Sequence, residues 1–303
     1  MNKTSHKLLA TALLATVVGG NSLAQGSGTL EKIKSAGSMT IGHRDASIPF
    51  SYLDDKQQPI GFSLDLCAKI VDAIKVELKM PALKVAYQPV TGATRIPLLA
   101  NGTIDLECGS TTNNAERQKQ IAYTYTSFVT ANRFISKKAD NLKTLADLKG
   151  KNVVSTAGTT NLRQLTELNA AQNLDINILV AKEHAESFLM VDTGRAVAFV
   201  MDDILLAGLA ANHANPGQWQ VSNDALSVEP YAIMLRKDDP AFKKVVDNAM
   251  ATMMKNGEYQ ALYAKWFLNP IPPKGINLNI PMSDSLKKVV ANPTDSPDPA
   301  AYK

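Results

Sequence analysis

Short β-rich runs alternate with amphipathic segments along most of this sequence. The expected strands are residues 39–42, 84–88, 104–107, 128–135, 152–155, 175–180, 196–201, 219–221 and 231–236. The expected helices are residues 62–78, 162–171, 185–191, 203–211, 240–255 and 258–267. Segment 62–78 illustrates the helical pattern, because its apolar residues Leu64, Val71 and Ile74 fall on one face. This alternation predicts an α/β fold in which sheets are covered by helices.

The length of the chain favours two lobes. Of the 303 residues, about 279 would remain after removal of an export signal, which exceeds the size at which a single core usually stops growing. The element order predicts a discontinuous lobe 1, residues 28–127 and 226–268, and an inserted lobe 2, residues 128–225. Two linkers near 127–131 and 222–226 would then lie side by side and form a hinge.

A C-terminal extension, residues 269–303, follows the predicted lobes. Pro270, Pro272 and Pro273 interrupt helix formation, and the tail from Pro281 is polar and rich in proline. We expect no helix in this tail. It would either pack on lobe 1 or be partly disordered.

The first 24 residues have the features of a secretory signal peptide. Lys3 and Lys7 precede the apolar run 8–18, and small residues lead to a predicted cleavage after Ala24. No later segment reaches the roughly 20 apolar residues that a spanning helix needs. Neither cysteine lies near the cleavage point, so we expect a soluble protein released into the periplasm.

Composition and motifs argue against several other functions. The formal net charge is +4, and removing the two signal lysines leaves 32 − 2 = 30 basic against 28 acidic residues, so nothing suggests nucleic-acid binding. The sequence lacks GxxxxGK[ST], GxSxG, HExxH and CxxC motifs. Its four histidines are widely spaced. We therefore expect no metal, no cofactor and no enzymatic activity.

Cys67 and Cys108 are 41 residues apart, a spacing that does not say whether they meet. In an oxidising compartment they could form a disulfide. Two buried thiols are the expectation that we favour, and neither outcome bears on activity.

Charged and hydroxyl residues follow several of the predicted strands, where open α/β sheets bind their ligands. Arg44 follows strand 39–42, Arg95 follows strand 84–88, and the segment 110–117 follows strand 104–107. Loop 157–160 has a similar position in the second lobe. Any one of these loops could serve only to cap a helix, and their combination is what indicates a ligand site.

Segment 110–117 has the pattern of a helix start. We expect Asn113 to be the N-cap, with Glu116 three residues later as in a capping box. The N-terminus of a helix favours a carboxylate, and Arg117 could add a bidentate pair. Thr160 has the corresponding place in the second lobe.

Three guanidinium groups in one cleft would repel each other unless anions accompanied them. Arg44, Arg95 and Arg117 therefore predict a ligand with more than one negative group. Asp202 or Asp203 could bind an ammonium group, although capping of the following helix is an equally good interpretation for both. His184 could donate to a second carboxylate, or could be a solvated surface residue.

Five segments of the chain resemble one family closely. They are residues 42–50, 95–102, the stretch ECGSTTNN at 107–114, residues 194–199 and residues 259–273. The sequence is similar to the periplasmic glutamate/aspartate-binding proteins of ABC transporters, within the polar amino acid solute-binding family. The similarity extends from about Gly28 to about Leu286, and ECGSTTNN is typical of the branch that binds acidic amino acids.

The resemblance implies a type II periplasmic binding fold, in which the ligand lies between two lobes. Arg117, Thr112 and Thr160 would hold the α-carboxylate of the amino acid. Asp202 and Ser110 would bind its α-ammonium group.

The same resemblance assigns Arg44, Arg95 and His184 to the side-chain carboxylate of the ligand. One departure occurs at Gly92, where the family usually has a serine whose hydroxyl reaches that carboxylate. Thr94 is a candidate replacement. The preference between glutamate and aspartate, and the affinity, are not settled by the sequence.

The function implied is capture of L-glutamate or L-aspartate by lobe closure, followed by delivery to an ABC transporter permease by a monomeric carrier. One alternative is a secreted dehydratase on the same fold, with His184 and Glu107 as acid and base. A second alternative is a ligand sensor that signals through a chemoreceptor.

Overall fold

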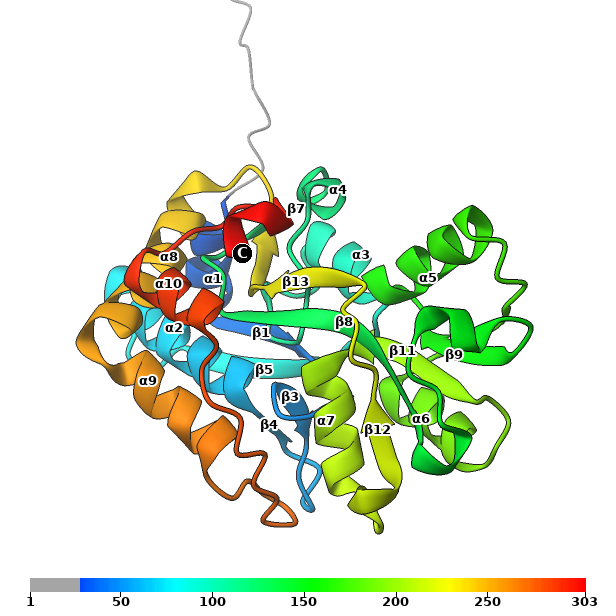
Figure 1. Ribbon diagram of the computed structural model, residues 1–303. Coiled ribbons are helices and arrows are strands. Elements are labelled where there is room, and N and C mark those ends of the chain that lie inside the picture. The colour runs from blue at the N-terminus through cyan, green and yellow to red at the C-terminus, as the bar shows by residue number, and fades with distance from the viewer. Residues whose placement is uncertain (1–27) are drawn as a thin grey trace, which may run out of the picture.

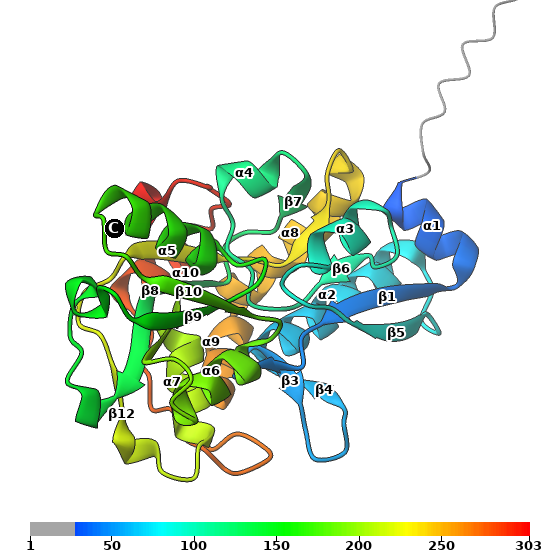
Figure 2. The ribbon, with the colours of Figure 1, turned by 90° about the vertical axis from the view of Figure 1, so that its right-hand side faces the viewer.

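The computed structural model describes residues 28–303, and their strands form two main sheets in separate halves of the molecule (Figures 1 and 2). The predicted signal peptide lies outside the described residues. A third, small sheet joins β2 (Ala46–Ser47), β3 (Ser51–Leu53) and β4 (Pro59–Ile60).

The first sheet has the strand order β5-β1-β6-β14-β7. Its strands are β1 (Ser38–His43), β5 (Lys84–Pro89), β6 (Leu106–Glu107), β7 (Ile121–Tyr123) and β14 (Met234–Arg236). β5, β1 and β6 are parallel, whereas β14 runs antiparallel to both β6 and β7. The helices of this half are α1 (Thr29–Ala36), α2 (Phe62–Leu78), α3 (Arg95–Ala100), α4 (Ala115–Gln118), α8 (Pro240–Asn256) and α9 (Glu258–Tyr263), which a π-helical turn, η4 (Ala264–Leu268), extends.

The second sheet has the order β10-β9-β11-β8-β12, and β13 pairs with β8 as well. Its strands are β8 (Phe128–Lys137), β9 (Asn152–Thr156), β10 (Asn177–Ala181), β11 (Ala198–Asp202), β12 (Trp219–Val221) and β13 (Ser227–Tyr231). Three helices belong to this half: α5 (Thr160–Ala171), α6 (His184–Asp192) and α7 (Asp203–Asn212). Short 3₁₀ turns lie at η1 (Lys138–Asp140), η2 (Leu145–Leu148) and η3 (Pro216–Gln218).

The two passages of the chain between the sheets run side by side. β8 and β13 are antiparallel, from Phe128 opposite Tyr231 to Asn132 opposite Ser227. The backbone N–H of Ser127 donates to the carbonyl of Tyr231 at 2.7 Å. Figure 1 shows both strands extending from the first half into the second. The lobe and linker boundaries given by the sequence remain predictions.

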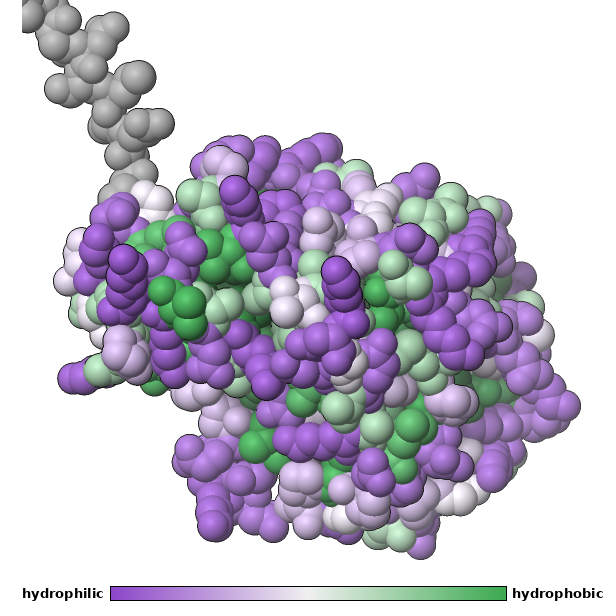
Figure 3. All heavy atoms as spheres, turned by 90° about the vertical axis from the view of Figure 1, so that its left-hand side faces the viewer, coloured by the Kyte–Doolittle hydropathy of each residue, from purple (hydrophilic) through white to green (hydrophobic). Residues whose placement is uncertain are grey.

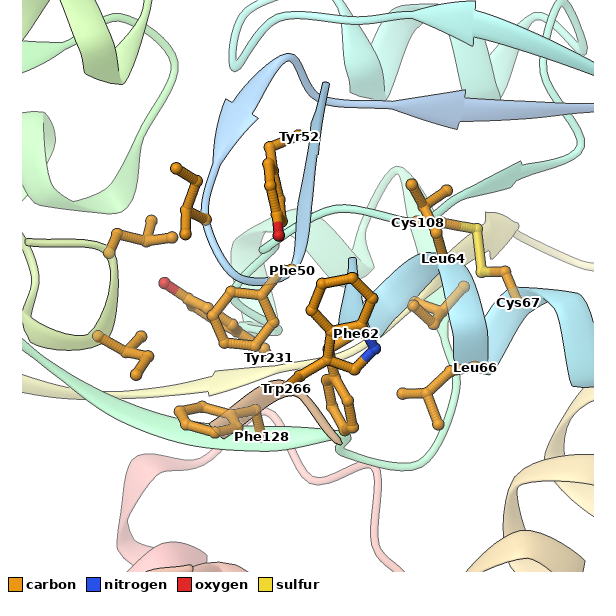
Figure 4. Close-up of a cluster of buried hydrophobic side chains, with 14 of the residues drawn as sticks. Phe50, Tyr52, Phe62, Leu64, Leu66, Cys67, Cys108, Phe128, Tyr231 and Trp266 are labelled. Carbon is orange, nitrogen blue, oxygen red and sulfur yellow. A yellow bond between two sulfur atoms is a disulfide. The ribbon is translucent and has the colours of Figure 1, made fainter. Parts of the chain in front are cut away.

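Aromatic side chains pack where the linkers leave the first half (Figure 4). The ring of Phe50 lies edge-on to Phe128 and Tyr231, with centroids 5.0 and 5.2 Å apart. Phe62, at the start of α2, lies 6.2 Å from Phe50. Gly61 precedes α2 at φ 141°, and a Cβ there would lie 2.2 Å from the carbonyl oxygen of Phe50. Glycine at this position therefore lets α2 begin directly against the aromatic cluster.

Cys67 and Cys108 form a disulfide, so the expectation of two buried thiols is wrong. The bond joins α2 to the residue that follows β6, and both cysteines are fully buried (Figure 4). The sequence left this outcome open because α2 and β6 become neighbours only through the tertiary fold. The bridge holds the segment that leads into residues 109–114.

Two predicted elements differ from the structure. Residues 231–236, expected as one strand, divide into the end of β13 and a separate β14, because the chain stops pairing with β8 and starts pairing with β6 and β7. The C-terminal tail, expected to lack helix, contains α10 (Asp284–Ala291), which the side chain of Ser283 caps. Leu286, Val289 and Val290 of α10 are buried, which is a helical spacing.

The C-terminal segment lies against the linker region. The carbonyl of Thr294 accepts from the backbone N–H of Thr126 at 2.8 Å. Within the 3₁₀ turn η5 (Pro299–Tyr302), the hydroxyl of Tyr302 lies 2.8 Å from that of Thr126. Lys274 Nζ donates to the carbonyl of Asn212 in α7 at 2.9 Å. This segment thus contacts both halves of the molecule.

The exposed surface is mostly polar. Figure 3 shows one face on which hydrophilic side chains predominate and hydrophobic ones form small patches. The large hydrophobic residues that are exposed lie on different elements: Val76, Tyr87, Val180, Leu189 and Leu268. Among residues 28–303, no helix is both long and apolar enough to cross a bilayer.

Replacing both cysteines by alanine should lower the free energy of unfolding by about 2–4 kcal/mol, because the bridge restricts the unfolded chain. Denaturant unfolding of the oxidised protein and of the double variant measures this difference. Added reductant should weaken the wild type and leave the variant unchanged. A wild type whose unfolding midpoint does not respond to reductant would contradict the bridge.

Candidate functional site

The residues that the sequence singled out converge on one small cavity between the two halves, whose free volume of about 10 Å³ has room for about one water molecule. Seven of the eight predicted positions line it: Arg95, Ser110, Thr112, Arg117, Thr160, His184 and Asp202. Thr159, Asn161, Met201 and Leu205 complete the lining. The two halves therefore lie close together at this point, and they would have to move apart to admit an amino acid.

Arg44, the eighth predicted residue, does not line this cavity but is fully buried beside it. It follows β1, and its backbone N–H donates to Ser51 Oγ at 2.8 Å. Its Nη2 lies 2.6 Å from Oε2 of Glu183, which belongs to the other half. Nε and Nη1 of Arg44 have no hydrogen-bond partner among the described residues.

Arg95 is the first residue of α3 and is 2% exposed. Its Nη1 donates to the hydroxyl of Thr111, which in turn donates to Glu107 at 2.7 Å. Burial, reinforced by the charge of Arg117, lowers the pKa of Arg95 to about 10. The guanidinium therefore remains charged at neutral pH, with Nε unpaired within the described chain.

Arg117 joins the two halves near the cavity. Its Nη1 donates to the carbonyl of Thr112 at 2.9 Å, and its Nη2 donates to the carbonyl of Gly158 at 3.1 Å. The predicted N-cap of its helix was wrong by one residue: the side chain of Asn114 accepts from Arg117 N–H, whereas Asn113 donates to the carbonyl of Asp295. The side chain of Asn113 does not cap the helix because it is hydrogen-bonded to the carbonyl of Asp295 in the C-terminal segment.

The N-terminus of α5 brings further polar groups to the cavity. Thr159 is the N-cap, and its hydroxyl accepts from Leu162 N–H. The hydroxyl of Thr160 donates to Glu229 Oε2 at 2.9 Å. Asn161, which sequence analysis missed, donates to Asp202 Oδ1 at 2.7 Å. Its place in the first turn of a helix after a strand was the signal that could have identified it.

Asp202 is the N-cap residue of α7, but its side chain makes no capping bond and reaches the cavity instead. The hydroxyl of Tyr231 donates to its Oδ2. Burial raises the pKa of Asp202, and the nearby carboxylate of Glu229 raises it further. A cationic group placed next to Asp202 would therefore stabilise its ionised form.

His184 is the first residue of α6 and is 2% exposed, so it is not a solvated surface histidine. Its Nδ1 lies 3.0 Å from the hydroxyl of Thr156. Burial, followed by the charges of Arg44 and Arg95, holds the pKa of His184 well below its usual value. The ring is thus neutral at neutral pH and can act as a hydrogen-bond donor or acceptor.

The loops after β5 and β9 approach each other backbone to backbone beside the cavity. A Cβ on Gly92 would lie 2.4 Å from the carbonyl oxygen of Ala157, and one on Gly158 would lie 2.4 Å from that of Gly92. Thr94 is exposed and bonds to the hydroxyl of Thr91 at 3.1 Å. Thr94 therefore does not take the place of the family's serine in the cavity lining.

Carboxylates accompany the three guanidiniums more closely than the sequence suggested. Glu183 pairs with Arg44, and Glu107 connects to Arg95 through Thr111. Glu229 on β13 and Glu107 are buried, whereas Glu183 is partly exposed. The sequence named Glu107 only as an alternative acid or base, and it did not single out Glu183 and Glu229, because their contacts join residues that are far apart in the sequence. These acids offset part of the positive charge but leave several guanidinium N–H groups unpaired.

A larger groove, with a volume of about 720 Å³, lies between β8, α7 and the C-terminal segment. Its charged residues, Arg133 and Asp203, already pair with each other at 3.1 Å. Within residues 28–303, no group of three or more His, Cys, Asp or Glu side chains is placed to hold a metal ion. The small polar cavity is therefore the better candidate for a site.

A family model described as "Bacterial extracellular solute-binding proteins, family 3" matches residues 39–269. The match covers both sheets and every residue of the site. The chain belongs to this family of solute-binding proteins.

Two glutamate/aspartate-binding proteins align with nearly the whole chain. An "L-glutamate/L-aspartate-binding protein" of Pseudomonas aeruginosa is 54% identical over 97% of this chain and 98% of its own length. A "Glutamate/aspartate import solute-binding protein" of Escherichia coli K12 is 46% identical over the same shares. These relatives are transport proteins rather than enzymes.

Solved structures of amino-acid-binding proteins share the fold. A mutant of ArgBP from T. maritima aligns with a TM-score of 0.70 at 26% identity, over 78% of this chain and 98% of the other. An ancestral arginine-binding protein bound to arginine gives 0.69 at 27% identity, over 76% and 98%. The predicted two-lobed, type II α/β fold of this solute-binding protein is thereby confirmed.

The Asp202→Asn variant should change how stability depends on pH. Because the pKa of Asp202 is raised, the folded state holds a proton that the unfolded state releases above about pH 4. The wild type should therefore lose stability, on the order of a few kcal/mol, as pH rises from about 4 toward neutrality. The variant should lack this loss.

Denaturant unfolding at several pH values, without added amino acid, measures the difference. Asp140→Asn, which changes an exposed aspartate, serves as the control and should follow the wild type. If the free energy of unfolding of Asp202→Asn and of the wild type depended on pH in the same way, the pKa of Asp202 in the folded protein would not be raised.

Proposed function

We propose that this protein captures L-glutamate or L-aspartate in the cavity between its lobes and delivers it to the membrane permease of an ABC transporter. The glutamate/aspartate-binding relatives, aligned over nearly the full length, support this proposal. We further propose that the signal peptide is cleaved after Ala24 and that the mature protein acts in the periplasm as a monomer. Its scattered exposed hydrophobic residues agree with a monomer.

One observation carries the proposal: buried guanidiniums with free N–H groups, a neutral histidine and a buried aspartate surround one small cavity. A ligand with two carboxylates and one ammonium group complements this arrangement. The arginines would pair with the carboxylates, and the ammonium would stabilise ionised Asp202. A ligand with fewer charges would leave buried donors unpaired, which is costly.

The α-carboxylate would be held by Arg117 and by the segments of Thr112 and Thr160. Because the Thr160 hydroxyl donates to Glu229, its backbone N–H at the start of α5 is the group available to a carboxylate. Asp202 would accept from the ammonium group, together with Ser110 Oγ, which has no partner among the described residues.

The side-chain carboxylate would be held by Arg44, Arg95 and His184. Arg95 and His184 line the cavity, whereas Arg44 is buried beside it with Nε and Nη1 unpaired within the described residues. The residues of the two sets come from both halves of the chain. Ligand bound to one lobe would therefore gain contacts only when the second lobe closes, which shifts the population toward the closed form.

The enzymatic alternative receives little support from the geometry. Glu107, the candidate partner of His184, is held by Thr111 and does not line the cavity. One solved structure is an ancestral amino acid-binding protein named as "a precursor of cyclohexadienyl dehydratase", at 30% identity over 79% of this chain. The transport relatives are considerably more similar. A role as a chemoreceptor ligand would use the same closed form.

Isothermal titration calorimetry with four amino acids tests the ligand class. L-Glutamate and L-aspartate should bind, with L-glutamine and L-asparagine weaker by about 100-fold or more, because a neutral amide leaves a buried guanidinium without its charged partner. Tight binding of glutamine without binding of glutamate would refute the proposal.

The variant Arg95→Met should weaken glutamate binding by about 10- to 100-fold, the loss expected for charge-assisted hydrogen bonds. It should weaken glutamine binding much less. Arg195→Met, which replaces an exposed arginine, is the control and should bind both amino acids as the wild type does. Equal losses for glutamate and glutamine in Arg95→Met would show that Arg95 does not recognise the second carboxylate.

A further inference from the structure

A carboxylate of the second half meets a cleft arginine of the first. Glu183 precedes α6, and its Oε2 lies 2.6 Å from Nη2 of Arg44, 139 positions away in the sequence. The Arg44 side chain is 1% exposed and that of Glu183 is 24% exposed. The pair therefore forms at the edge of the buried site, where solvent screens it only in part.

The position of Glu183 at the start of α6 does not explain why a glutamate is present there. Glu183 occupies the N-cap position of α6 but makes no capping bond with its carboxylate. Serine, threonine, aspartate and asparagine are the usual residues at such a position. The ion pair to Arg44 is the only bond of this carboxylate within residues 28–303.

The nitrogens of the Arg44 guanidinium fall into two groups, one that is paired and one that is free to bind a ligand. One nitrogen binds Glu183, whereas Nε and Nη1 are buried without partners. A Cβ at Gly109 would lie 3.0 Å from Arg44 Cγ, which places the arginine stem against the loop that carries Ser110. A contact that fixes Nη2 also fixes how the other nitrogens are presented.

We propose that Glu183 is a positioning residue that couples closure of the lobes to the orientation of Arg44. Separation of the halves breaks this ion pair, so the pair stabilises only the closed form. Closed, it holds Arg44 in place beside the site. The inference rests on the proposed function for its ligand, although the closure effect itself does not require a particular amino acid.

The coupling has a definite kinetic consequence. The pair forms after ligand has met the open protein, so its loss should leave the association rate nearly unchanged and raise the dissociation rate. A partly buried, charge-assisted bond predicts an increase of about 3- to 30-fold. The opposite arrangement, in which Glu183 competes with the ligand for Arg44, predicts tighter binding once the carboxylate is neutralised.

Stopped-flow binding of L-glutamate to Glu183→Gln tests the proposal, with Glu186→Gln as the matched control. Glu186 lies in the first turn of the same helix, and its carboxylate accepts from the backbone N–H of Lys182 at 2.9 Å within the same half. Faster dissociation in Glu183→Gln alone supports the coupling. In an Arg44→Met background, Glu183→Gln should have no further effect. Unchanged or tighter binding by Glu183→Gln would overturn the proposal.

Small-angle X-ray scattering separates this inference from the proposed function. Each protein is measured without amino acid and with saturating L-glutamate, and Glu183→Gln should be more expanded than Glu186→Gln in at least one condition. A difference in a protein that does not bind glutamate would support the coupling and refute the ligand assignment. If both variants bound glutamate with identical scattering and identical rates, the ligand assignment would be supported and the coupling by Glu183 would be refuted.

Discussion

The cost of burying guanidinium groups governs the arrangement of this molecule. Arg44, Arg95 and Arg117 lie within the protein near one cavity, and each must find acceptors or counter-charges there. Arg117 uses carbonyl groups from both halves, Arg95 uses the Thr111 hydroxyl, and Arg44 uses Glu183. None of the three has all of its donors satisfied by such contacts in the part of the chain described. In the proposed function, the remaining donors would favour an anionic ligand.

Strand β13, which pairs with β8 where the chain passes between the two sheets, bonds to residues of the cavity. Tyr231 donates to Asp202, and Glu229 accepts from Thr160, so two residues of the cavity are bonded to the strand that joins the halves. Burial and the mutual repulsion of the two acids raise the pKa of Asp202. A cation that binds Asp202 would thus alter the charge state of a group bonded to β13. In the proposed function, ligand binding and closure of the lobes would involve the same hydrogen bonds.

Local sequence patterns predicted most of the elements and the positions of the site. Segment 62–78 forms α2 with the expected bounds, because its apolar face and Gly61 act locally. The residues at strand ends converged because parallel strands end at a common edge. Helix α10 was missed although Leu286, Val289 and Val290 have helical spacing, since the surrounding prolines were given more weight.

Contacts between distant segments could not be predicted from the sequence. Asn113 lost its expected capping function to a carbonyl 182 residues away. Nothing in the local sequence distinguishes Glu183 and Glu229 from other charged residues. Their carboxylates bind Arg44 and Thr160, which come from distant segments of the chain. The pairing of Cys67 with Cys108 likewise depends on how α2 packs beside β6.

The position of that disulfide links the site to the compartment in which the chain folds. Cys108 is two residues before Ser110, so the bridge anchors the loop that supplies Ser110 and Thr112 to the cavity. Thiols stay reduced in the bacterial cytosol and oxidise after export. The loop consequently receives its covalent anchor only outside the cytosol. A chain retained inside the cell would lack this bond, so its Ser110 and Thr112 loop would be held less firmly than in the exported protein.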